Sequence, residues 1–232
     1  MAVRVEPHQE IKGVYWVTLE DGARRLATRN LAPGRDVYGE RLIRHEGVEY
    51  RLWDAYRSKL AASILKGIKP VRLTPGNRVL YLGAATGTTA SHVSDIVGVD
   101  GHVYCVEFSA RVMRELINNV CMHRPNMTPI LADARIPTLY STLVTTVDGI
   151  YCDIAQPEQA KVLADNADLF LKNEGWIMLA IKARSIDVAE RPSELYRREM
   201  RTLEERGFLI EDSVHLEPYD KDHVMVVARY RK

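Results

Sequence analysis

Cysteine is scarce in this chain of 232 residues, which has only Cys105, Cys121 and Cys152. Their number is odd, and their spacing is not that of a metal site. This argues against a disulfide framework, predicts no metal site and favours buried thiols in a reducing compartment. No stretch approaches the roughly 18 consecutive apolar residues of a membrane span, and residues 1–4 lack the apolar core of a secretory signal. The chain, 46% hydrophobic, can still bury a sizeable core. We therefore predict a soluble, cytoplasmic protein without a membrane partner.

The chain also lacks a large excess of positive or negative charge, and its formal net charge is only +1. The distribution is uneven: residues 1–78 hold 15 basic and nine acidic residues, whereas residues 79–232 hold 17 and 22. Residues 51–78 contain seven basic residues, which we call the basic stripe, and a single acidic residue, Asp54. The stripe either contacts phosphates or is a solvated helix face, and the weak overall charge predicts poor RNA binding by the chain alone. Its members are Arg51, Arg57, Lys59, Lys66, Lys69, Arg72 and Arg78.

The G-x-G-x-x-G pattern of dinucleotide-binding proteins is missing too. Residues 81–89 instead read YLGAATGTT, after an apolar strand-like run and before a predicted helix. Gly83 and Gly87 let the backbone approach a ligand, and the helix start offers unpaired N–H groups. Glu107 follows Gly83 by 24 residues, close to the roughly 20-residue offset at which an acid binds ribose hydroxyls. The pattern favours S-adenosylmethionine over NAD; the alternative is an ordinary turn with a surface glutamate.

Two parts with different patterns make up the chain. Residues 1–54 hold short β-patterned runs between turn residues and predict a small N-terminal antiparallel β domain. These runs span 13–19, 24–28, 40–45 and 48–52. After a helical pattern at 58–66, strands and helices alternate through the second part, residues 55–232, as a doubly wound sheet requires. Its predicted strands span 79–82, 103–107, 128–131, 149–153, 176–181, 209–215 and 223–230, and its predicted helices span 89–97, 109–122, 157–170 and 193–206.

The last two predicted strands are joined only by residues 216–222, a link too short for a crossover helix. They should therefore pair as an antiparallel hairpin at the end of a mostly parallel, seven-stranded sheet. This arrangement predicts an α/β fold of the class I S-adenosylmethionine-dependent methyltransferase type, which is Rossmann-like.

Polar residues follow several of these strands, where an open parallel sheet binds its ligands. We expect Glu107 at the cofactor ribose, Asp133 at the adenine amino group and Phe108 over the ring. Asp153 and Lys182 each end a buried strand, where a charge is costly unless it is paired or used. A surface ion pair at the rim of the sheet is the alternative for these two. The predicted cofactor-binding residues are Gly83, Ala84, Gly87, Thr88, Thr89, Glu107, Phe108, Asp133, Ala134, Asp153 and Gln156.

Seven sequence blocks carry a resemblance to one known family. They are RSKLAA at 57–62, YLGAATGTT at 81–89, VEFS at 106–109, DAR at 133–135, DIAQP at 153–157, IKARSID at 181–187 and EPYDKDH at 217–223. With these blocks the chain resembles the fibrillarins, which are box C/D guide-RNA-directed ribose 2′-O-methyltransferases. The blocks outside the glycine turn are not general methyltransferase signatures, so the resemblance is specific. The glycine- and arginine-rich extension of eukaryotic fibrillarins is missing, which makes the chain similar to the short archaeal form.

The resemblance implies a catalytic quartet of Lys59, Asp153, Lys182 and His223. Lys182 is the candidate proton acceptor, Asp153 would orient Lys182 and the hydroxyl, and His223 is either catalytic or structural. The implied substrate is ribosomal RNA, with transfer RNA as a second candidate. The implied partners are a box C/D guide RNA, a coiled-coil scaffold protein and a kink-turn-binding ribosomal-type protein.

Two other classes of function remain open. A stand-alone methyltransferase for a small molecule or a protein would explain Gly83 and Glu107, but it would leave Lys59 and the basic stripe without a role. A non-catalytic RNA-assembly subunit that keeps the fold is disfavoured, because Lys59, Asp153 and Lys182 are all present.

Overall fold

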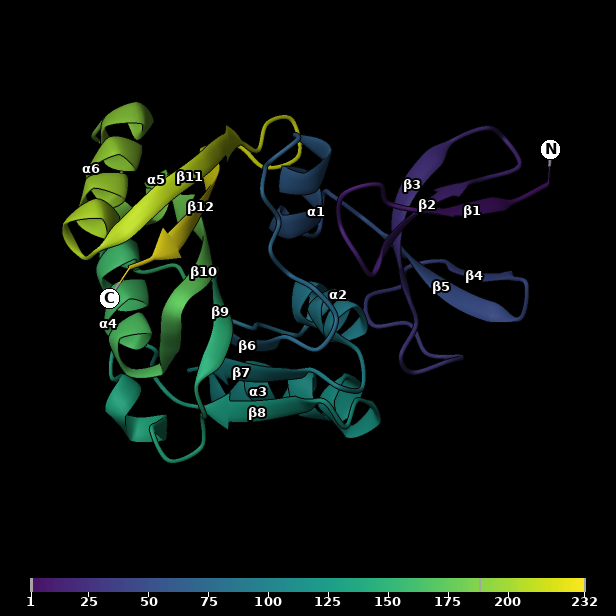
Figure 1. The fold of residues 1–232 in the computed structure, drawn as a ribbon, viewed down its shortest axis with the longest axis horizontal. Coiled ribbons are helices and arrows are strands. Elements are labelled where there is room, and N and C mark those ends of the chain that lie inside the picture. Colours follow the sequence, from purple (N-terminus) through teal and green to yellow (C-terminus); the bar gives the residue numbers. More distant parts are fainter. Residues whose placement is uncertain (1, 188, 232) are drawn as a thin grey trace.

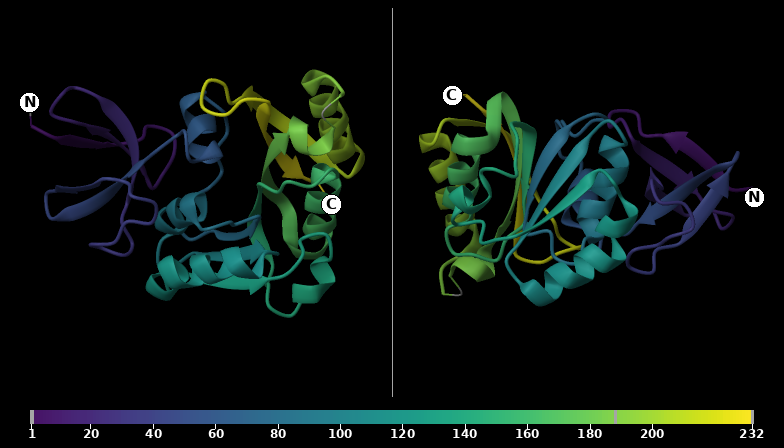
Figure 2. Two further views of the ribbon diagram at one scale, coloured as in Figure 1. Left: turned by 180° about the vertical axis from the view of Figure 1, so that it is seen from behind. Right: turned by 90° about the horizontal axis from the view of Figure 1, so that it is seen from below.

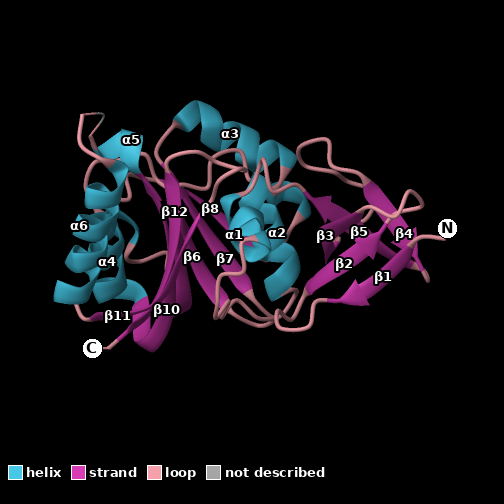
Figure 3. Cartoon of the chain, turned by 90° about the horizontal axis from the view of Figure 1, so that it is seen from above, coloured by secondary structure: helices cyan, strands magenta, loops and turns pink. Residues whose placement is uncertain are grey.

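The computed structural model describes residues 2–187 and 189–231 and contains two β-sheets (Figure 1). A small N-terminal sheet lies beside α1 (Lys59–Leu65) and α2 (Thr88–Val97), and a larger sheet carries helices on both of its faces (Figures 2 and 3). Within the described ranges, no helix is both long enough and apolar enough to cross a membrane.

The small sheet is antiparallel throughout, with the strand order β1-β2-β3-β5-β4. Its strands are β1 (Arg4–Pro7), β2 (Val14–Thr18), β3 (Arg24–Arg29), β4 (Leu42–His45) and β5 (Val48–Trp53). The sequence predicted β2 to β5 but missed β1. That strand lies at the edge of the sheet and has only four residues, of which Val5 alone is partly buried, so its apolar alternation is too short to recognise. The predicted small antiparallel sheet is thus confirmed with one additional strand.

The large sheet has the strand order β11-β12-β10-β9-β6-β7-β8. Only β12 is antiparallel to its neighbours β10 and β11, which confirms the predicted seven-stranded sheet with its C-terminal hairpin. The order reverses between β6 and β9, and such a switch point is where open α/β sheets bind ligands. The strands are β6 (Arg78–Leu82), β7 (His102–Glu107), β8 (Met127–Leu131), β9 (Val147–Cys152), β10 (Leu171–Lys182), β11 (Phe208–His215) and β12 (His223–Tyr230).

Helices cover the two faces of the large sheet over separate hydrophobic clusters. One cluster packs α1, α2 and α3 (Ala110–Asn119), and the other packs α4 (Gln159–Phe170) and α6 (Pro192–Glu205). The predicted helix at 109–122 ends earlier and continues as a short 3-10 turn, η1 (Cys121–His123). The short helix α5 (Ala183–Ile186) and the 3-10 turn η2 (Pro137–Tyr140) were not predicted.

Charged side chains are buried where the small sheet meets α2. Arg51 of β5 is fully buried and pairs with Glu40 at 2.6 Å and with Asp95 of α2 at 2.8 Å. Both interpretations of the stripe, phosphate contact and a solvated helix face, are therefore wrong for Arg51, because its charge is used inside the protein. Lys69 and Arg72 also have acidic partners, Glu10 and Glu211 respectively.

The predicted domain boundary after residue 54 falls between β5 and α1. Leu26 and Trp53 of the small sheet share a hydrophobic cluster with residues of α1 and α2. Because both apolar and charged contacts join the two parts, the division into residues 1–54 and 55–232 stays a prediction.

Candidate active site

The glycine turn after β6 brings two strand ends into contact. Gly83 has a φ of +81°, and a Cβ added there would lie 2.4 Å from the carbonyl oxygen of Asp153. Any larger residue would thus be strained and would clash with the backbone that follows β9. Gly87, with a φ of +94°, forms the N-cap of α2. The turn therefore places the start of α2 and Asp153 at the same edge of the sheet.

A cavity of about 230 Å³ opens beside this turn, at the carboxyl ends of the parallel strands. Predicted cofactor-binding residues that line it are Gly83, Glu107, Phe108, Asp133, Ala134, Asp153 and Gln156. Ala84, Gly87, Thr88 and Thr89 lie outside the lining and build the turn and the first residues of α2. The lining also includes Ala85, Val106, Ala132, Ile154, Ala155 and Lys182, which were not predicted to bind the cofactor.

Glu107 ends β7 inside the cavity and is 8% exposed. Its two carboxylate oxygens accept hydrogen bonds from the backbone N–H groups of Ala85, at 3.2 Å, and Ser109, at 2.9 Å. These bonds fix the carboxylate, and each oxygen retains a lone pair for a further donor. A ribose diol is a ligand of this kind, so the geometry fits the predicted role of Glu107.

Asp133 also lines the cavity, two residues after β8, the neighbour of β7, and is held by Arg135. The Arg135 side chain donates to Asp133 Oδ2 at 2.6 Å. This hydrogen bond is the main reason why the pKa of Asp133 is lowered, so the carboxylate stays ionised. Phe108 is 70% exposed at the same cavity. An anionic acceptor and an accessible aromatic ring suit an adenine with its amino group.

Asp153 is the centre of the predicted catalytic quartet. Its Oδ1 lies 2.9 Å from Lys182 Nζ, and its Oδ2 lies 3.4 Å from Lys59 Nζ. Lys59 follows Ser58, whose side chain caps α1 by accepting from the N–H of Ala61. The cap fixes Lys59 at the first position of the helix. The start of α1, the residue after β9 and the end of β10 thus place one carboxylate between two ammonium groups.

Electrostatics keep this arrangement charged. Burial alone would raise the pKa of Asp153, but Lys59 and Lys182 outweigh burial and lower it. Burial would likewise lower the pKa of Lys59, but Asp153 and Asp220 outweigh it and raise that pKa. Near neutral pH, Asp153 is therefore an anion and Lys59 a cation.

Asp220 is a member of the site that the sequence did not single out. Its Oδ2 lies 3.3 Å from Lys59 Nζ, and its Oδ1 lies 3.0 Å from His223 Nδ1. Asp220 is the acid three positions before His223 in the EPYDKDH block, which was the available signal. His223 is also the register partner of Lys182 across β12 and β10, so Lys59, Asp153, Lys182, Asp220 and His223 lie together at one edge of the sheet, and this group is named the catalytic ring.

The ring nitrogens of His223 have distinct roles. Nδ1 lies 2.6 Å from the carbonyl oxygen of Lys221, and a carbonyl oxygen only accepts hydrogen bonds. Nδ1 therefore carries the proton, and in the neutral ring Nε2 is the acceptor.

Gln159 holds the backbone of Lys182 and was not predicted. Its side chain is fully buried, donates to the Lys182 carbonyl oxygen at 3.2 Å and accepts from the Lys182 N–H at 2.9 Å. This double hydrogen bond ties the start of α4 to the end of β10 and fixes the backbone from which the Lys182 side chain extends.

Known proteins resemble this chain over nearly its whole length. The family model for fibrillarin matches residues 5–232. A fibrillarin-like rRNA/tRNA 2′-O-methyltransferase of Staphylothermus marinus is 60% identical over 230 residues, which is 99% of this chain and 98% of that protein. The crystal structure of Aeropyrum pernix fibrillarin with natively bound S-adenosyl-L-methionine has a TM-score of 0.92 and 55% identity, covering 98% of this chain and 99% of that one. A fibrillarin solved in complex with Nop5p has a TM-score of 0.84 and 41% identity, covering 98% and 100%.

Proposed function

Because this chain belongs to the fibrillarin family, we propose that it methylates ribose 2′-hydroxyls of ribosomal and transfer RNA, with S-adenosylmethionine as the methyl donor. It acts as the catalytic subunit of a box C/D guide-RNA ribonucleoprotein. The observation that carries this proposal is the ring of charged side chains around Asp153, directly beside the cavity of Gly83 and Glu107.

The chain supplies positioning and a proton acceptor for the reaction. S-adenosylmethionine, when bound, supplies a methyl group on a sulfonium, which is the electrophile. The 2′-oxygen of the ribose forms the new bond to the methyl carbon as the carbon–sulfur bond breaks. Lys182 lines the cavity and, as an ammonium group, first releases a proton to water; its amine form then accepts the hydroxyl proton. Asp153 orients Lys182, and Lys59 holds the second oxygen of Asp153. The side chain that accepts the proton is therefore held in one position.

Cofactor binding is predicted to depend on Glu107. Replacing this residue in Glu107→Ala removes charge-assisted hydrogen bonds worth roughly 1.5–3 kcal/mol, which weakens S-adenosylmethionine binding by about tenfold or more. Isothermal titration calorimetry measures this directly. The control is Glu115→Ala, which removes a glutamate that is partly exposed on α3; this variant should bind the cofactor like the wild type. An unchanged affinity of Glu107→Ala, or preferential binding of NAD, refutes the assignment.

The proposed partners are a box C/D guide RNA, a coiled-coil scaffold protein and a kink-turn-binding ribosomal-type protein. The scaffold is supported by the complex of a 41% identical fibrillarin with Nop5p. The guide RNA and the kink-turn protein rest on the resemblance of the sequence blocks. The cytoplasmic location is likewise a proposal.

RNA binding by the isolated chain is expected to be weak and unselective. The net charge is +1, and Arg51, Lys69 and Arg72 of the basic stripe pair with acids of the protein. Few cations of this stripe remain to displace counterions from RNA. Fluorescence anisotropy with labelled target RNA at physiological salt measures the affinity. Tight, sequence-selective binding without partners contradicts guide dependence.

The acceptor of the methyl group distinguishes this function from its rivals. With labelled S-adenosylmethionine, we expect label in RNA and only when a matched guide complex is present. Label in free proteins or small molecules favours a stand-alone methyltransferase. Cofactor binding without any transfer in the full complex favours a non-catalytic assembly subunit.

A further inference from the structure

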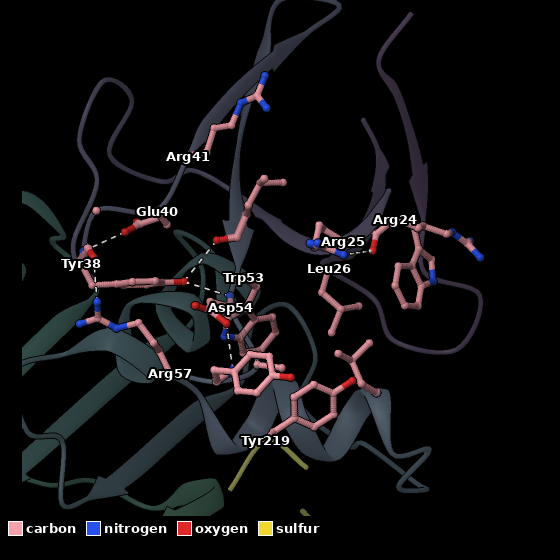
Figure 4. Close-up of a pocket in the computed structure, with 16 residues that line it drawn as sticks. Arg24, Arg25, Leu26, Tyr38, Glu40, Arg41, Trp53, Asp54, Arg57 and Tyr219 are labelled. Atoms are coloured by element: carbon pink, nitrogen blue, oxygen red, sulfur yellow. Dashed lines mark hydrogen bonds between the residues drawn. The ribbon is translucent and has the colours of Figure 1, made fainter. Parts of the chain in front are cut away.

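A second cavity, of about 890 Å³, lies between the small sheet, α1 and the loop that joins β11 to β12 (Figure 4). The small sheet contributes residues of β2, β3 and β5 to its lining, α1 contributes Leu65, and the loop contributes Tyr219. The cofactor has a separate cavity, and the two cavities have no lining residue in common. This larger cavity is therefore free for another ligand.

Positive charge dominates the larger cavity. Its lining contains four exposed arginines and only two acids. One of the acids, Glu40, is already paired with the buried Arg51. The other, Asp54, accepts a hydrogen bond from the backbone N–H of Tyr56. The four arginines are Arg24, Arg25, Arg41 and Arg57.

Aromatic rings pack against two of these arginines. Tyr38 stacks against the Arg57 guanidinium at 5.2 Å, and Trp16 lies under that of Arg24 at 4.4 Å. The ring of Tyr56 is 68% exposed and meets the ring of Tyr219 edge-on, with centroids 5.1 Å apart. A basic groove with accessible aromatic rings is the surface on which nucleic acid strands bind, with phosphates on the cations and bases on the rings.

The larger cavity also borders the catalytic ring. Tyr219 directly precedes Asp220, which pairs with Lys59 and His223. Tyr56 lies three residues before Lys59 in the segment that leads into α1. A strand whose ribose lies at Lys182 and Lys59 would therefore meet Tyr56 and Tyr219 next.

We propose that this cavity holds the RNA strand that flanks the methylated ribose, with its phosphates on Arg25 and Arg41 and a base against Tyr56. This inference rests on the proposed function, because it extends the same substrate beyond the reacting nucleotide. A protein partner with an acidic surface is the other possible occupant. The direct continuity with Asp220 favours RNA, since the RNA must reach the catalytic ring and a scaffold protein need not.

The test uses the full chain assembled with guide RNA and partner proteins, and two cavity variants. In Arg25→Ala/Arg41→Ala we expect the KM for target RNA to rise about tenfold or more, because charge-assisted hydrogen bonds to phosphate are removed. The salt dependence of RNA binding should also become shallower, with a slope smaller by about one for each phosphate that is no longer bound. In Tyr56→Ala the removal of one stacking ring should raise KM about fivefold or more. Arg197→Ala/Arg201→Ala, which removes two exposed arginines from α6 on the other face of the sheet, is the matched control and should behave like the wild type.

Three further readouts separate the possible outcomes. The affinity for S-adenosylmethionine, the rate at saturating RNA and the co-sedimentation with the scaffold protein should stay unchanged in both cavity variants. An unchanged KM and salt slope overturns the inference. Loss of scaffold binding also overturns it and assigns the cavity to a protein partner. If the wild-type complex transfers no methyl group, the proposed function fails, and anisotropy with labelled target RNA still decides whether the cavity binds RNA.

Discussion

Lys182→Ala is expected to reduce the single-turnover rate of methyl transfer by about 10²–10⁴-fold at saturating cofactor, the usual contribution of a general base. Lys182 Nζ lies 2.9 Å from Asp153 and lines the cofactor cavity, whereas Glu107 holds the other end of that cavity. The change should therefore leave cofactor affinity and assembly of the complex largely intact. Quenched-flow methylation in the assembled complex measures the rate.

Two further variants sharpen this prediction. Lys182→Arg should not restore the rate, because a guanidinium does not readily give up its proton and has a different shape. Lys66→Ala removes an exposed lysine at the C-terminal end of α1 and should keep the wild-type rate. If Lys182→Ala keeps a near-native rate, the residue is not the proton acceptor, and the site works by alignment of the reactants alone.

Asp95→Ala is expected to lower the free energy of unfolding by about 3–5 kcal/mol, because it removes an acidic partner from each of two buried arginines. The Asp95 carboxylate is fully buried, pairs with Arg51 and Arg124, and accepts hydrogen bonds from Thr28 Oγ1 at 2.7 Å and Leu31 N at 2.9 Å. It thus joins α2 to the small sheet. Chemical denaturation followed by far-UV circular dichroism measures the change in stability.

Asp100→Ala is the matched control for this change. Asp100 follows α2 and is exposed, so its replacement should alter the free energy of unfolding by no more than about 0.5 kcal/mol. Equal stability of Asp95→Ala and the wild type would show that the buried charges relax to other partners. It would also remove the argument that this network fixes the small sheet against α2.

Most of the large sheet could be predicted from the sequence because its strands are apolar runs separated by helical patterns. The antiparallel hairpin followed from the short link between β11 and β12. Short or exposed elements could not be predicted in this way. β1 has only four residues, of which Val5 alone is partly buried, and α5 also has only four residues.

The location of candidate site residues could be predicted where a polar residue ends or follows a strand, as at Glu107, Asp153 and Lys182, which all line the cavity. Residues whose role comes from tertiary pairing were missed or misread. Gln159 is fully buried in α4, and nothing in its local sequence shows that it holds the backbone of Lys182. Arg51 was read as part of a surface stripe, because its partner Asp95 lies 44 residues further along the chain.

The central claim is that a guide RNA selects the ribose that this chain methylates. The most direct measurement maps 2′-O-methyl groups at nucleotide resolution after reaction of the assembled complex with one target RNA and two guides whose pairing differs by one nucleotide. We expect the methyl group to move by one nucleotide with the guide and to be absent when the guide is mismatched. Methylation at the same position with both guides, or on a base instead of a ribose, would contradict the account.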